Sequence, residues 1–489
     1  MIPYSTLIPI KKGISTPVYL QICNSFITLI KDGILKKGTR LPGTRLLSSL
    51  LNVHRKTVIA AFEELQAQGW ININPSSGTF VSEALPEVKL KVLKQQLSSL
   101  NPEKHTGFYI RKNEVLNTNV YVRTSLLEIN DGLPDERLAP MDSLSRAIRS
   151  VLKGQRGKRH LSYDEIAGNR NLRRELAKHL NETRAFNIET ENIFITRGTI
   201  NALYLCCNAL LEKGDNVVVG DPGYRSVNLI IENFGGNLIK VPVDNQGLCI
   251  ETIEKICGKK KIRAIYVTPH HHYPTTVTMP PERRIALLQL AEKYKIAIIE
   301  DDYDYDYHYR HSPFLPLASA DPYGLVIYIG SFSKTFSPAF RVGYLVAPQN
   351  LITEVSKLRR IIDRQGDTVL EQALAELFKQ GEIKAHLRRT QKEYHQRRDD
   401  FCKSLVEKFA EKIRFDIPEG GMAVWATFDP KYPLQAVSGK AASLGLYISS
   451  GQHFNPKEIT YNATRMGFAG LDTNEIEKAL SLLEKSLSG

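Results

Sequence analysis

The chain has 489 residues, of which 42% are hydrophobic and 24% charged, and since this length exceeds what one hydrophobic core usually supports, we expect two or three domains. Its formal net charge is +13, and residues 1–82 are rich in lysine and arginine and poor in acidic residues, a balance that favours a nucleic-acid partner for this region. No stretch approaches the ~20 uninterrupted apolar residues of a membrane helix, and the N-terminus lacks the basic and apolar regions of a signal peptide, so we expect a cytoplasmic protein with no membrane partner.

The first part of the chain predicts three helices followed by a pair of strands. Apolar residues recur at helical spacing over 17–30, which predicts the first helix. Thr44 is placed to cap a short second helix, and the third helix begins near Arg55. Alternating residues at 70–73 and 79–81 predict two strands joined by a turn. Three helices and a hairpin make a winged helix-turn-helix, whose recognition helix enters the major groove by its N-terminal residues.

Three segments of this module are similar to the GntR family of regulators. They are the turn at Gly38–Arg45, the helix start at Val53–Val58 and the wing at Ser77–Val81. The resemblance implies that residues 1–82 bind double-stranded DNA. By the same resemblance, the DNA contacts are made by Arg40, Thr44, Arg45, Arg55, Lys56, Thr57 and, in the wing, Gly78. His54 departs from the family, which usually has serine as the N-cap, although an imidazole nitrogen can still accept a hydrogen bond. The residues alone leave open a protein-binding module with solvated basic side chains.

The rest of the chain divides into a connector and a large α/β region. Residues 83–125 are polar and irregular, apart from a short helix favoured at 89–94, and are expected to form a linker. Within 126–489, short apolar strands alternate with helical stretches, which predicts a mainly parallel sheet covered on both faces. Polar residues gather after the strands' carboxyl ends, where such sheets bind ligands. The clearest strands are expected at 216–219, 264–267, 297–299 and 325–329.

A lysine follows the last of these strands in the sequence Ser331-Phe332-Ser333-Lys334, and Arg341 comes seven residues later. Lysine forms Schiff bases with carbonyl cofactors when its surroundings favour the neutral amine. Serine hydroxyls and a nearby arginine suit a phosphate dianion. A lone lysine after a strand is most often a surface residue, so this interpretation depends on the other residues of the set.

A second polar cluster, Asp301 and Tyr303, follows the strand at 297–299. Strand alternation places the two side chains on one face. An aspartate beside a pyridine nitrogen keeps that nitrogen protonated, and a tyrosine hydroxyl can bond the ring's phenolate oxygen. The acids and tyrosines that continue to His308 also fit a metal site, but solvated side chains explain them as well, and we expect no metal.

Further positions complete a candidate ligand site. Gly198 and Thr199 stand at the start of an apolar helix, where backbone N–H groups bind anions. Tyr224 follows a strand and offers an aromatic face, and Arg465 can clamp a carboxylate through two hydrogen bonds. Each is ambiguous by itself, because a tyrosine in a turn often only packs and a late arginine often forms a structural ion pair.

Together these residues resemble the fold-type I enzymes that use pyridoxal phosphate (PLP), the aspartate aminotransferase superfamily. The resemblance runs from about Leu126 to the end and includes Gly132-Leu133-Pro134-Asp135 and Tyr163. It implies a PLP-binding domain over 126–489 with a mainly parallel sheet and a smaller C-terminal α+β subdomain. It also implies that the cofactor's phosphate is held by Gly198, Thr199, Ser331, Ser333 and Arg341.

The same resemblance implies a role for each remaining residue of the set. Lys334 would bind the cofactor covalently and act as the catalytic lysine of an active enzyme. Asp301 would bind the pyridine nitrogen, and Tyr303 the ring hydroxyl. Tyr224 would stack on the ring, and Arg465 would take the carboxylate of the effector.

The loop at 268–276 departs from that superfamily. Tyr273 stands where many aminotransferases have asparagine, and Thr276 where they have glycine. A proline-rich loop with an aromatic residue is typical of regulators of the MocR subfamily, which fuse both modules. The consecutive histidines His270 to His272 could form a metal cluster, but their side chains point in different directions, so we expect a loop packed over the cofactor. The six cysteines show no CxxC spacing, so we expect neither zinc nor disulfides.

The MocR resemblance implies a PLP-dependent transcriptional regulator in which a head-to-tail homodimer brings two reading heads to paired half-sites of an operator. A small amino compound, or PLP itself, would act as the effector by shifting the sensor between open and closed states. The alternative is a functional PLP-dependent aminotransferase with an accessory DNA-binding domain, in which Lys334 moves protons. Turnover of amino donors would support the enzyme, and effector-dependent DNA binding would support the regulator.

Overall fold

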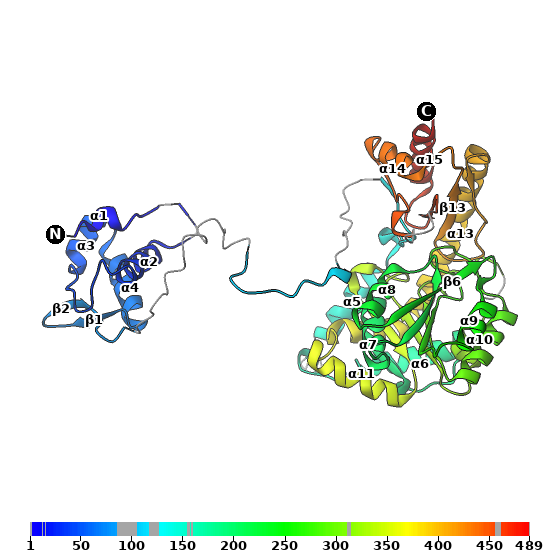
Figure 1. Cartoon of the computed structure of the whole chain (residues 1–489), viewed down its shortest axis with the longest axis horizontal. Coiled ribbons are helices and arrows are strands. Elements are labelled where there is room, and N and C mark those ends of the chain that lie inside the picture. Colours follow the sequence, from blue (N-terminus) through cyan, green and yellow to red (C-terminus); the bar gives the residue numbers. More distant parts are fainter. Residues whose placement is uncertain are drawn as a thin grey trace. The chain divides into compact units, whose positions relative to one another are not determined.

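The computed structural model divides into two compact units, residues 1–111 and 112–489 (Figure 1). The structure describes residues 2–11, 13–14, 16–85, 105–116, 127–153, 157, 160–310, 314–454 and 461–488. Only residues 83–85 and 105–116 of the predicted linker are described, and the short helix predicted at 89–94 lies outside the described residues. In this described part of the chain, no helix is both long and apolar enough to cross a bilayer.

The N-terminal unit packs short helices against a two-stranded sheet. Its elements are α1 (Tyr4–Leu7), α2 (Val18–Lys31), α3 (Thr44–Leu51), α4 (Arg55–Ala67), β1 (Ile71–Asn74) and β2 (Gly78–Val81). Phe26 of α2 and Phe62 of α4 are buried and meet edge to face, with ring centroids 5.8 Å apart. β1 and β2 pair antiparallel, with Ile71 opposite Val81. The predicted three helices and hairpin are confirmed; α1 was not predicted, because four residues are too few to show a helical period.

The start of α3 differs from the prediction that Thr44 caps this helix. Gly43, in extended backbone, is the N-cap, and Thr44 is the first helical residue. Because a capping side chain has to precede the first turn, Thr44 stands one residue too late to serve. Its hydroxyl instead accepts a hydrogen bond from Arg55 Nε at 3.3 Å, which joins the starts of α3 and α4.

The second unit is built on an eight-stranded sheet in the order β4-β11-β10-β9-β8-β5-β6-β7. The strands are β4 (Ile193–Thr196), β5 (Asn216–Asp221), β6 (Asn237–Asp244), β7 (Gly247–Leu248), β8 (Ala264–Val267), β9 (Ala297–Asp302), β10 (Val326–Ser331) and β11 (Gly343–Val346). From β10 to β6 all neighbours are parallel, whereas β11 runs antiparallel to β10 and β4, and β7 to β6. The predicted parallel core, β5 with β8 to β10, is confirmed.

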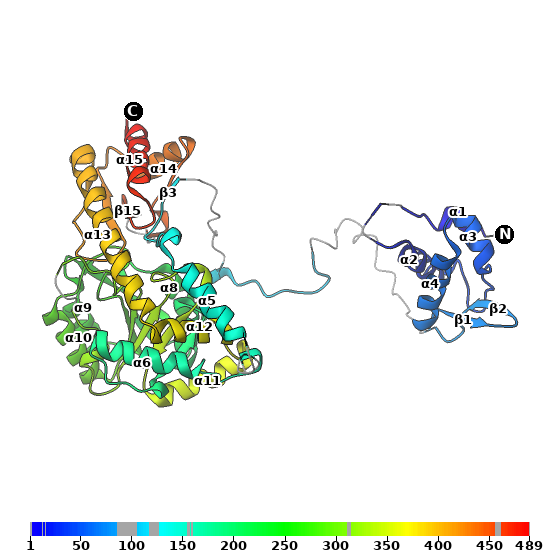
Figure 2. The ribbon, with the colours of Figure 1, turned by 180° about the vertical axis from the view of Figure 1, so that it is seen from behind.

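Helices cover both faces of this sheet. They are α5 (Met141–Leu152), α6 (Arg170–Arg184), α7 (Thr199–Leu210), α8 (Arg225–Asn233), α9 (Ile250–Cys257), α10 (Pro281–Tyr294), α11 (Gln349–Ile362) and α12 (Thr368–Lys379). Val217 and Val219 of β5 pack with α7, α8 and α11, whereas Val218 between them packs with α9 and α10. On the same side as α9 and α10, α12 lies beside α5 and α6 (Figure 2). Burial of alternate residues on opposite faces explains the nearly continuous apolar strands.

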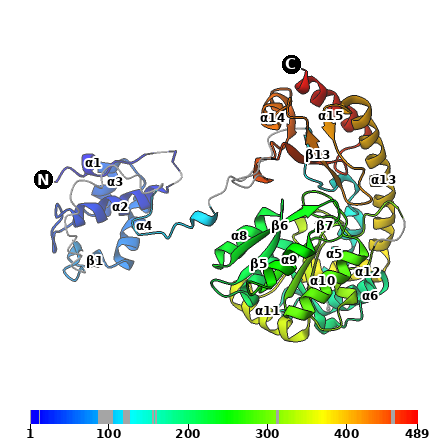
Figure 3. The ribbon, with the colours of Figure 1, turned by 45° about the vertical axis from the view of Figure 1, so that its right-hand side comes forward.

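A smaller α+β subdomain follows α13 (Glu382–Phe409), a helix of 28 residues that packs beside the last helix (Figure 3). Its other elements are β12 (Ile413–Arg414), β13 (Ala423–Phe428), α14 (Leu434–Ser443), β14 (Leu446–Ile448), β15 (Ala463–Gly467) and α15 (Thr473–Leu487). β12, β13 and β15 form an antiparallel sheet, and β14 pairs in parallel with β3 (Leu127–Ile129). The β3–β14 pairing places the residues just after β3 at the same cavity as residues near the ends of β9 and β10 of the large sheet.

Candidate functional site

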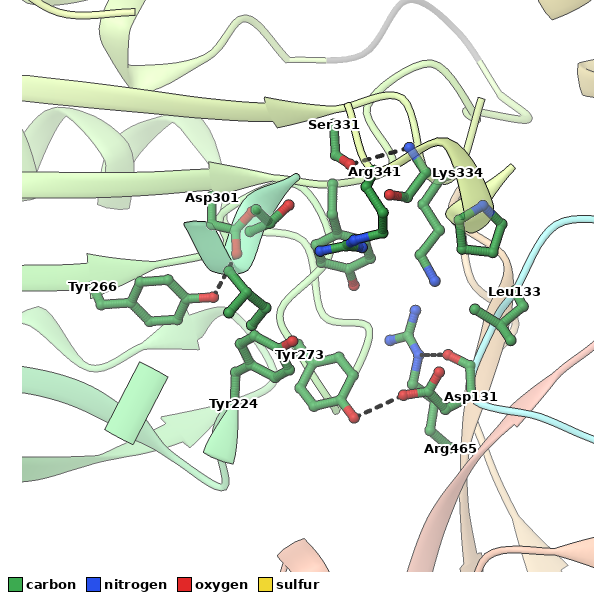
Figure 4. Close-up of a pocket in the computed structure, with 15 residues that line it drawn as sticks. Asp131, Leu133, Tyr224, Tyr266, Tyr273, Asp301, Ser331, Lys334, Arg341 and Arg465 are labelled. Carbon is green, nitrogen blue, oxygen red and sulfur yellow. Dashed lines mark hydrogen bonds between the residues drawn. The ribbon is translucent and has the colours of Figure 1, made fainter. Parts of the chain in front are cut away.

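A cavity of about 260 Å³ lies where β9 and β10 end and where the residue run after β3 meets β15 (Figure 4). It is lined by side chains from both sequence-predicted clusters and from both parts of the second unit. The predicted residues that line it are Thr199, Tyr224, Asp301, Tyr303, Ser331, Ser333, Lys334, Arg341 and Arg465. The cavity therefore gathers residues that are more than 260 positions apart in the sequence, from Thr199 to Arg465.

Lys334 points into this cavity from the turn after β10. Its Nζ donates a hydrogen bond to the main-chain oxygen of Gly132 at 2.6 Å. Burial lowers the pKa of Lys334; the negative charge of Asp131 opposes that effect, and the positive charge of Arg465 adds to it. A lowered pKa increases the share of neutral amine at a given pH, and the neutral amine is the form that attacks a carbonyl carbon.

Asp301, near the carboxyl end of β9, is buried at the opposite wall of the cavity. Tyr266 Oη donates a hydrogen bond to its Oδ2 at 2.8 Å, but its buried Oδ1 has no hydrogen-bond partner among the described residues. Burial raises the pKa of Asp301 to about 7. Because a buried acceptor without a partner is costly, the site is built to receive an N–H donor at Oδ1. Tyr303, two residues on, donates its hydroxyl to the main-chain oxygen of His271 at 2.9 Å.

The start of α7 and the turns after β10 form a cradle suited to an anion. Gly198, the N-cap of α7, has φ of 79°, and a Cβ there would lie 2.9 Å from Arg341 Nη2. The positive φ therefore favours glycine at this position, and any side chain there would also have to displace the guanidinium. Ser333 N donates to Ser331 Oγ at 3.1 Å, which turns the chain around the cradle. Free N–H groups at a helix start, two serines and an arginine are what a phosphate requires.

Arg465 lies on β15, which pairs with β13, and its side chain is 1% exposed. Its Nε donates to the main-chain oxygen of Asp131 at 2.8 Å, and its Nη2 lies 4.0 Å from Asp304 Oδ2. Its guanidinium carbon lies 5.3 Å from the ring centre of Tyr273. These contacts fix the orientation of a buried positive charge at the cavity wall.

Several residues that line the cavity were missed by the sequence interpretation: Asp131, Leu133, Ile200, Tyr266, Tyr273 and Pro338. Tyr273 was noted as a departure from the usual asparagine, in a loop expected to pack over the cofactor, but no role was assigned to it. Its hydroxyl donates to Asp131 Oδ2 at 2.9 Å. The sequence contained one indication that Asp131 belongs to the site: it lies directly before the Gly132-Leu133-Pro134-Asp135 segment that carries the family resemblance.

The interpretation that the acids and tyrosines after Tyr303 are solvated is wrong for most of them. Asp304, Tyr305 and Tyr307 are buried, because this segment runs beneath the C-terminal subdomain and packs against α6 and α13. Asp304 Oδ1 lies 2.7 Å from His271 Nδ1, and Asp306 pairs with Arg184 at 2.8 Å. These charges hold elements together.

The consecutive histidines also have separate partners. His270 Nε2 contacts the main-chain oxygen of Phe314 at 2.5 Å, and His272 Nε2 that of Pro222 at 2.9 Å. His271 bonds Asp304. Within the described ranges, no three or more His, Cys, Asp or Glu side chains are grouped to hold a metal ion. Hydrogen bonds to three different segments therefore fix this loop next to the cavity that Tyr273 lines.

The residues predicted to contact DNA lie at the starts of α3 and α4, in the β1–β2 hairpin and, for Arg40, in the segment before α3 that bridges to Phe80 of β2. Arg40, Arg45, Arg55 and Lys56 are exposed, and Thr44, Thr57 and Gly78 are half-buried. His54 is the N-cap of α4, and its Nδ1 accepts a hydrogen bond from Lys56 N at 3.2 Å, as an imidazole at this position can. The guanidinium of Arg40 lies over Gly78, within 3.3 Å of where a Cβ would stand. The module thus presents basic groups beside the exposed first turn of α4.

Comparison with known families separates the chain into the same two kinds of module. Residues 125–483 match the family Aminotransferase class I and II, and residues 18–81 match Bacterial regulatory proteins, gntR family. The first match covers most of the chain and includes all the cavity residues named above. The second covers α2 to β2 of the N-terminal unit.

Two curated regulators match nearly end to end. The probable rhizopine catabolism regulatory protein MocR of Rhizobium meliloti is 25% identical over 98% of this chain and 96% of its own length. The HTH-type pyridoxine biosynthesis transcriptional regulator PdxR of Corynebacterium glutamicum is 27% identical over 97% of this chain and 96% of its own. Among solved structures, the kynurenine aminotransferase of Pyrococcus horikoshii, solved with PMP, has a TM-score of 0.69 and 26% identity, covering 74% of this chain and 91% of its own.

Proposed function

This chain belongs to the aminotransferase class I and II family, and from that membership, with its gntR-type module, we propose that the Lys334 cavity is the sensor site of a DNA-binding regulator. The chain is a PLP-dependent transcriptional regulator of the MocR type. The relatives that match it end to end carry regulator names, whereas the solved kynurenine aminotransferase covers 74% of it. Its partners are DNA and a small-molecule effector.

One observation carries the assignment of the cofactor to this cavity. The buried Asp301 Oδ1 lacks a partner among the described residues, in the same cavity as a buried lysine and an anion cradle. A protonated pyridine nitrogen, an aldehyde and a phosphate are the three groups of PLP that would satisfy these three features. When bound, PLP supplies an aldehyde that combines reversibly with amines.

Within that cavity, we assign a role to each residue. Asp301 would hold a proton on the ring nitrogen, Tyr303 would bond the ring hydroxyl, and Tyr224 would stack on the ring. Lys334 would bind the cofactor covalently through its side-chain amine. The phosphate is held by Gly198, Thr199, Ser331, Ser333 and Arg341.

The effector is proposed to be a small amino compound with a carboxylate that Arg465 binds. Arg465 is buried and held in place by hydrogen bonds from Nε to Asp131 O at 2.8 Å and from Nη1 to Pro274 O at 3.5 Å, so its guanidinium is oriented before a carboxylate binds. Occupancy of the cavity would shift the population of sensor states and so change the affinity for DNA.

DNA recognition is assigned to residues 1–82 of the N-terminal unit, with residues 83–125 as the linker to the sensor at 126–489. Arg55, Lys56 and Thr57, in the first turn of α4, would enter the major groove, with Thr44 and Arg45 at the start of α3 beside them. Arg40 would contact the DNA backbone, and the wing around Gly78 would lie at the adjacent minor groove. The protein would act in the cytoplasm, where bacterial DNA lies.

A head-to-tail homodimer on paired half-sites is the proposed assembly. The second unit exposes several large apolar side chains near the end of α11: Leu161 at 71%, Tyr163 at 73% and Ile361 at 82%. The Arg364 guanidinium lies 4.2 Å from the Tyr163 ring centre, which places Tyr163 beside the chain just after α11, and we take Leu161, Tyr163 and Ile361 together as the proposed contact patch. Apolar patches of this kind are typical of protein–protein contacts.

A spectroscopic titration tests the cofactor site. Wild-type protein should gain a visible absorption band on addition of PLP near neutral pH, and Lys334→Ala should not, because no covalent link to the side chain can form. A band of equal position and strength in Lys334→Ala would refute the assignment. If the PLP-loaded wild type instead turns over amino donors near the ~10 s⁻¹ typical of enzymes, this result would support the alternative that the protein is an aminotransferase.

A further inference from the structure

One acidic side chain in the cavity has no task in the proposed function. Asp131 is the second residue after β3 and lines the cavity beside Lys334 and Arg465 (Figure 4). The cavity's other carboxylate, Asp301, lies at the opposite wall and is assigned to the cofactor ring. Among the described residues that line the cavity, Asp131 is therefore the carboxylate at the end formed by Lys334 and Arg465.

The carboxylate of Asp131 is oriented but not neutralised by contact. Tyr273 Oη donates to its Oδ2 at 2.9 Å. Arg465 donates a hydrogen bond from Nε to the main-chain oxygen of Asp131 at 2.8 Å and not to its carboxylate. In the described part of the chain, no Lys, Arg or His nitrogen lies within 4.0 Å of the Asp131 carboxylate, the limit for an ion pair. A ligand cation could occupy that position without displacing an existing salt bridge.

The group is charged at neutral pH despite its burial. Burial works against the charge, but the positive charges of Lys334 and Arg465 and the Tyr273 hydrogen bond outweigh it and hold the pKa of Asp131 below its usual range. A desolvated carboxylate stabilises a cation placed against it and repels a second carboxylate.

The aromatic rings around Tyr273 also favour a bound cation. The Tyr273 ring lies 5.1 Å from that of Tyr224 and 5.9 Å from that of Phe454, and Phe454 in turn contacts Trp425 at 5.2 Å. Ring faces attract ammonium groups, and a carboxylate beside such rings strengthens that attraction.

We propose that Asp131 is a specificity-determining residue that binds a second ammonium group of the effector. The effector would then be a diamino carboxylic acid: one amine faces Lys334, the carboxylate meets Arg465, and the second amine meets Asp131. This inference rests on the proposed function, which assigns Lys334 and Arg465. It narrows the effector from any amino compound to a basic amino acid.

Two matched sets of probes test the proposal by calorimetry on the PLP-loaded full chain. Lysine, norleucine and 1,5-diaminopentane share one skeleton and differ only in the second amine or the carboxylate; ornithine, norvaline and 1,4-diaminobutane are the shorter set. In at least one set, the diamino acid should bind about tenfold or more tightly than the amino acid without the second amine. It should also exceed the diamine, which lacks the carboxylate.

Substitution of Asp131 then identifies the group responsible. Asp131→Asn keeps the shape and an acceptor for Tyr273 but removes the charge, so the ratio between diamino acid and monoamino acid should fall to near one. Asp131→Glu, which keeps the charge, should retain a preference for the diamino acid. Asp416→Asn removes an exposed carboxylate in the loop between β12 and β13 and should leave the ratio unchanged.

The wild-type ratios alone can overturn the inference, even if Asp131→Asn fails to fold. Equal binding of diamino and monoamino acids, or an unchanged ratio in folded Asp131→Asn, would refute the role of Asp131. If none of the six probes binds but 4-aminobutyrate does, the inference fails and the proposed function stands. If the protein takes up neither PLP nor any amine, the proposed function fails first and the inference fails with it.

Discussion

Buried charges in the sensor cavity are stabilised by specific partners, and Asp301 shows what happens when one partner is missing. Its Oδ2 is bonded to Tyr266, and its Oδ1 has no partner among the described residues. Burial raises its pKa to about 7, well above the ordinary 3.8 of an aspartate. The cofactor-free protein therefore holds a proton there at pH values where an unfolded chain has released it.

This difference predicts a pH dependence that Asp301→Asn removes. Because the folded pKa is raised, the free energy of unfolding of cofactor-free wild type should fall, relative to the variant, as pH rises from about 4 to about 7. The relative slope should reach at most about 1.4 kcal/mol per pH unit and vanish above pH 7. Urea unfolding of both proteins across this range measures it. Two curves that stay parallel throughout would contradict the raised pKa.

Thr276 carries backbone strain at the position where the resemblance to aminotransferases leads us to expect glycine. Its φ is 62°, in the left-handed region that β-branched residues disfavour by about 1–2 kcal/mol. Thr276→Gly relieves this strain but raises the conformational entropy of the unfolded chain, which offsets part of the benefit. We therefore expect a net gain of about 0.5–1 kcal/mol in the free energy of unfolding. Urea unfolding provides the measurement, with Thr276→Ala, which keeps a Cβ, as the control. A loss of stability in Thr276→Gly would mean that the side chain's packing outweighs the strain.

At the scale of elements, the first turn of α4 is the part of the N-terminal unit to which we assign DNA recognition. It is capped by His54 and linked to α3 through the Arg55–Thr44 hydrogen bond. Arg55 is exposed there, so it is available for a base edge or a phosphate.

Arg55→Ala should weaken DNA binding in a way that reports which contact is made. A lost base contact should cost about 1–3 kcal/mol and relax the sequence preference, whereas a lost phosphate contact should reduce the slope of log K against log salt by about 1. Fluorescence anisotropy over a salt series distinguishes these results. Lys431→Ala removes one exposed charge from the second unit and serves as the control. Identical behaviour of the two variants would refute the assignment of α4 as the recognition helix.

The sequence predicted elements well where one local pattern decided them, and poorly where distant residues did. β5, β8, β9 and β10 were predicted because burial on both faces gives them unbroken apolar runs. The buried state of Asp304 was not predicted, because its partner His271 comes from another loop. Asp131 was missed for the same reason: Tyr273, which orients it, lies 142 residues away. That Lys334 and Asp301 line one cavity could be predicted, because each lies within three residues of the carboxyl end of its strand.

At the scale of the whole molecule, the proposed homodimer predicts the effect of a charge in the apolar patch near the end of α11. Ile361 is 82% exposed, so Ile361→Glu should leave the monomer's fold intact while placing a charge in the interface. Analytical ultracentrifugation should show a dimer dissociation constant raised about tenfold or more. Ile285→Glu, at a 56% exposed position on α10, is the matched control. Equal association of both variants would place the interface elsewhere.

The central claim is that occupancy of the Lys334 cavity changes DNA affinity. The most direct test measures the dissociation constant of the full chain for DNA upstream of its own gene, with and without PLP and the diamino acid probes. Wild type should show a change of about 5–150-fold, the usual range of such coupling, and Lys334→Ala should show none. A wild-type affinity unmoved by ligands that demonstrably fill the cavity, or an undiminished response in Lys334→Ala, would contradict the account.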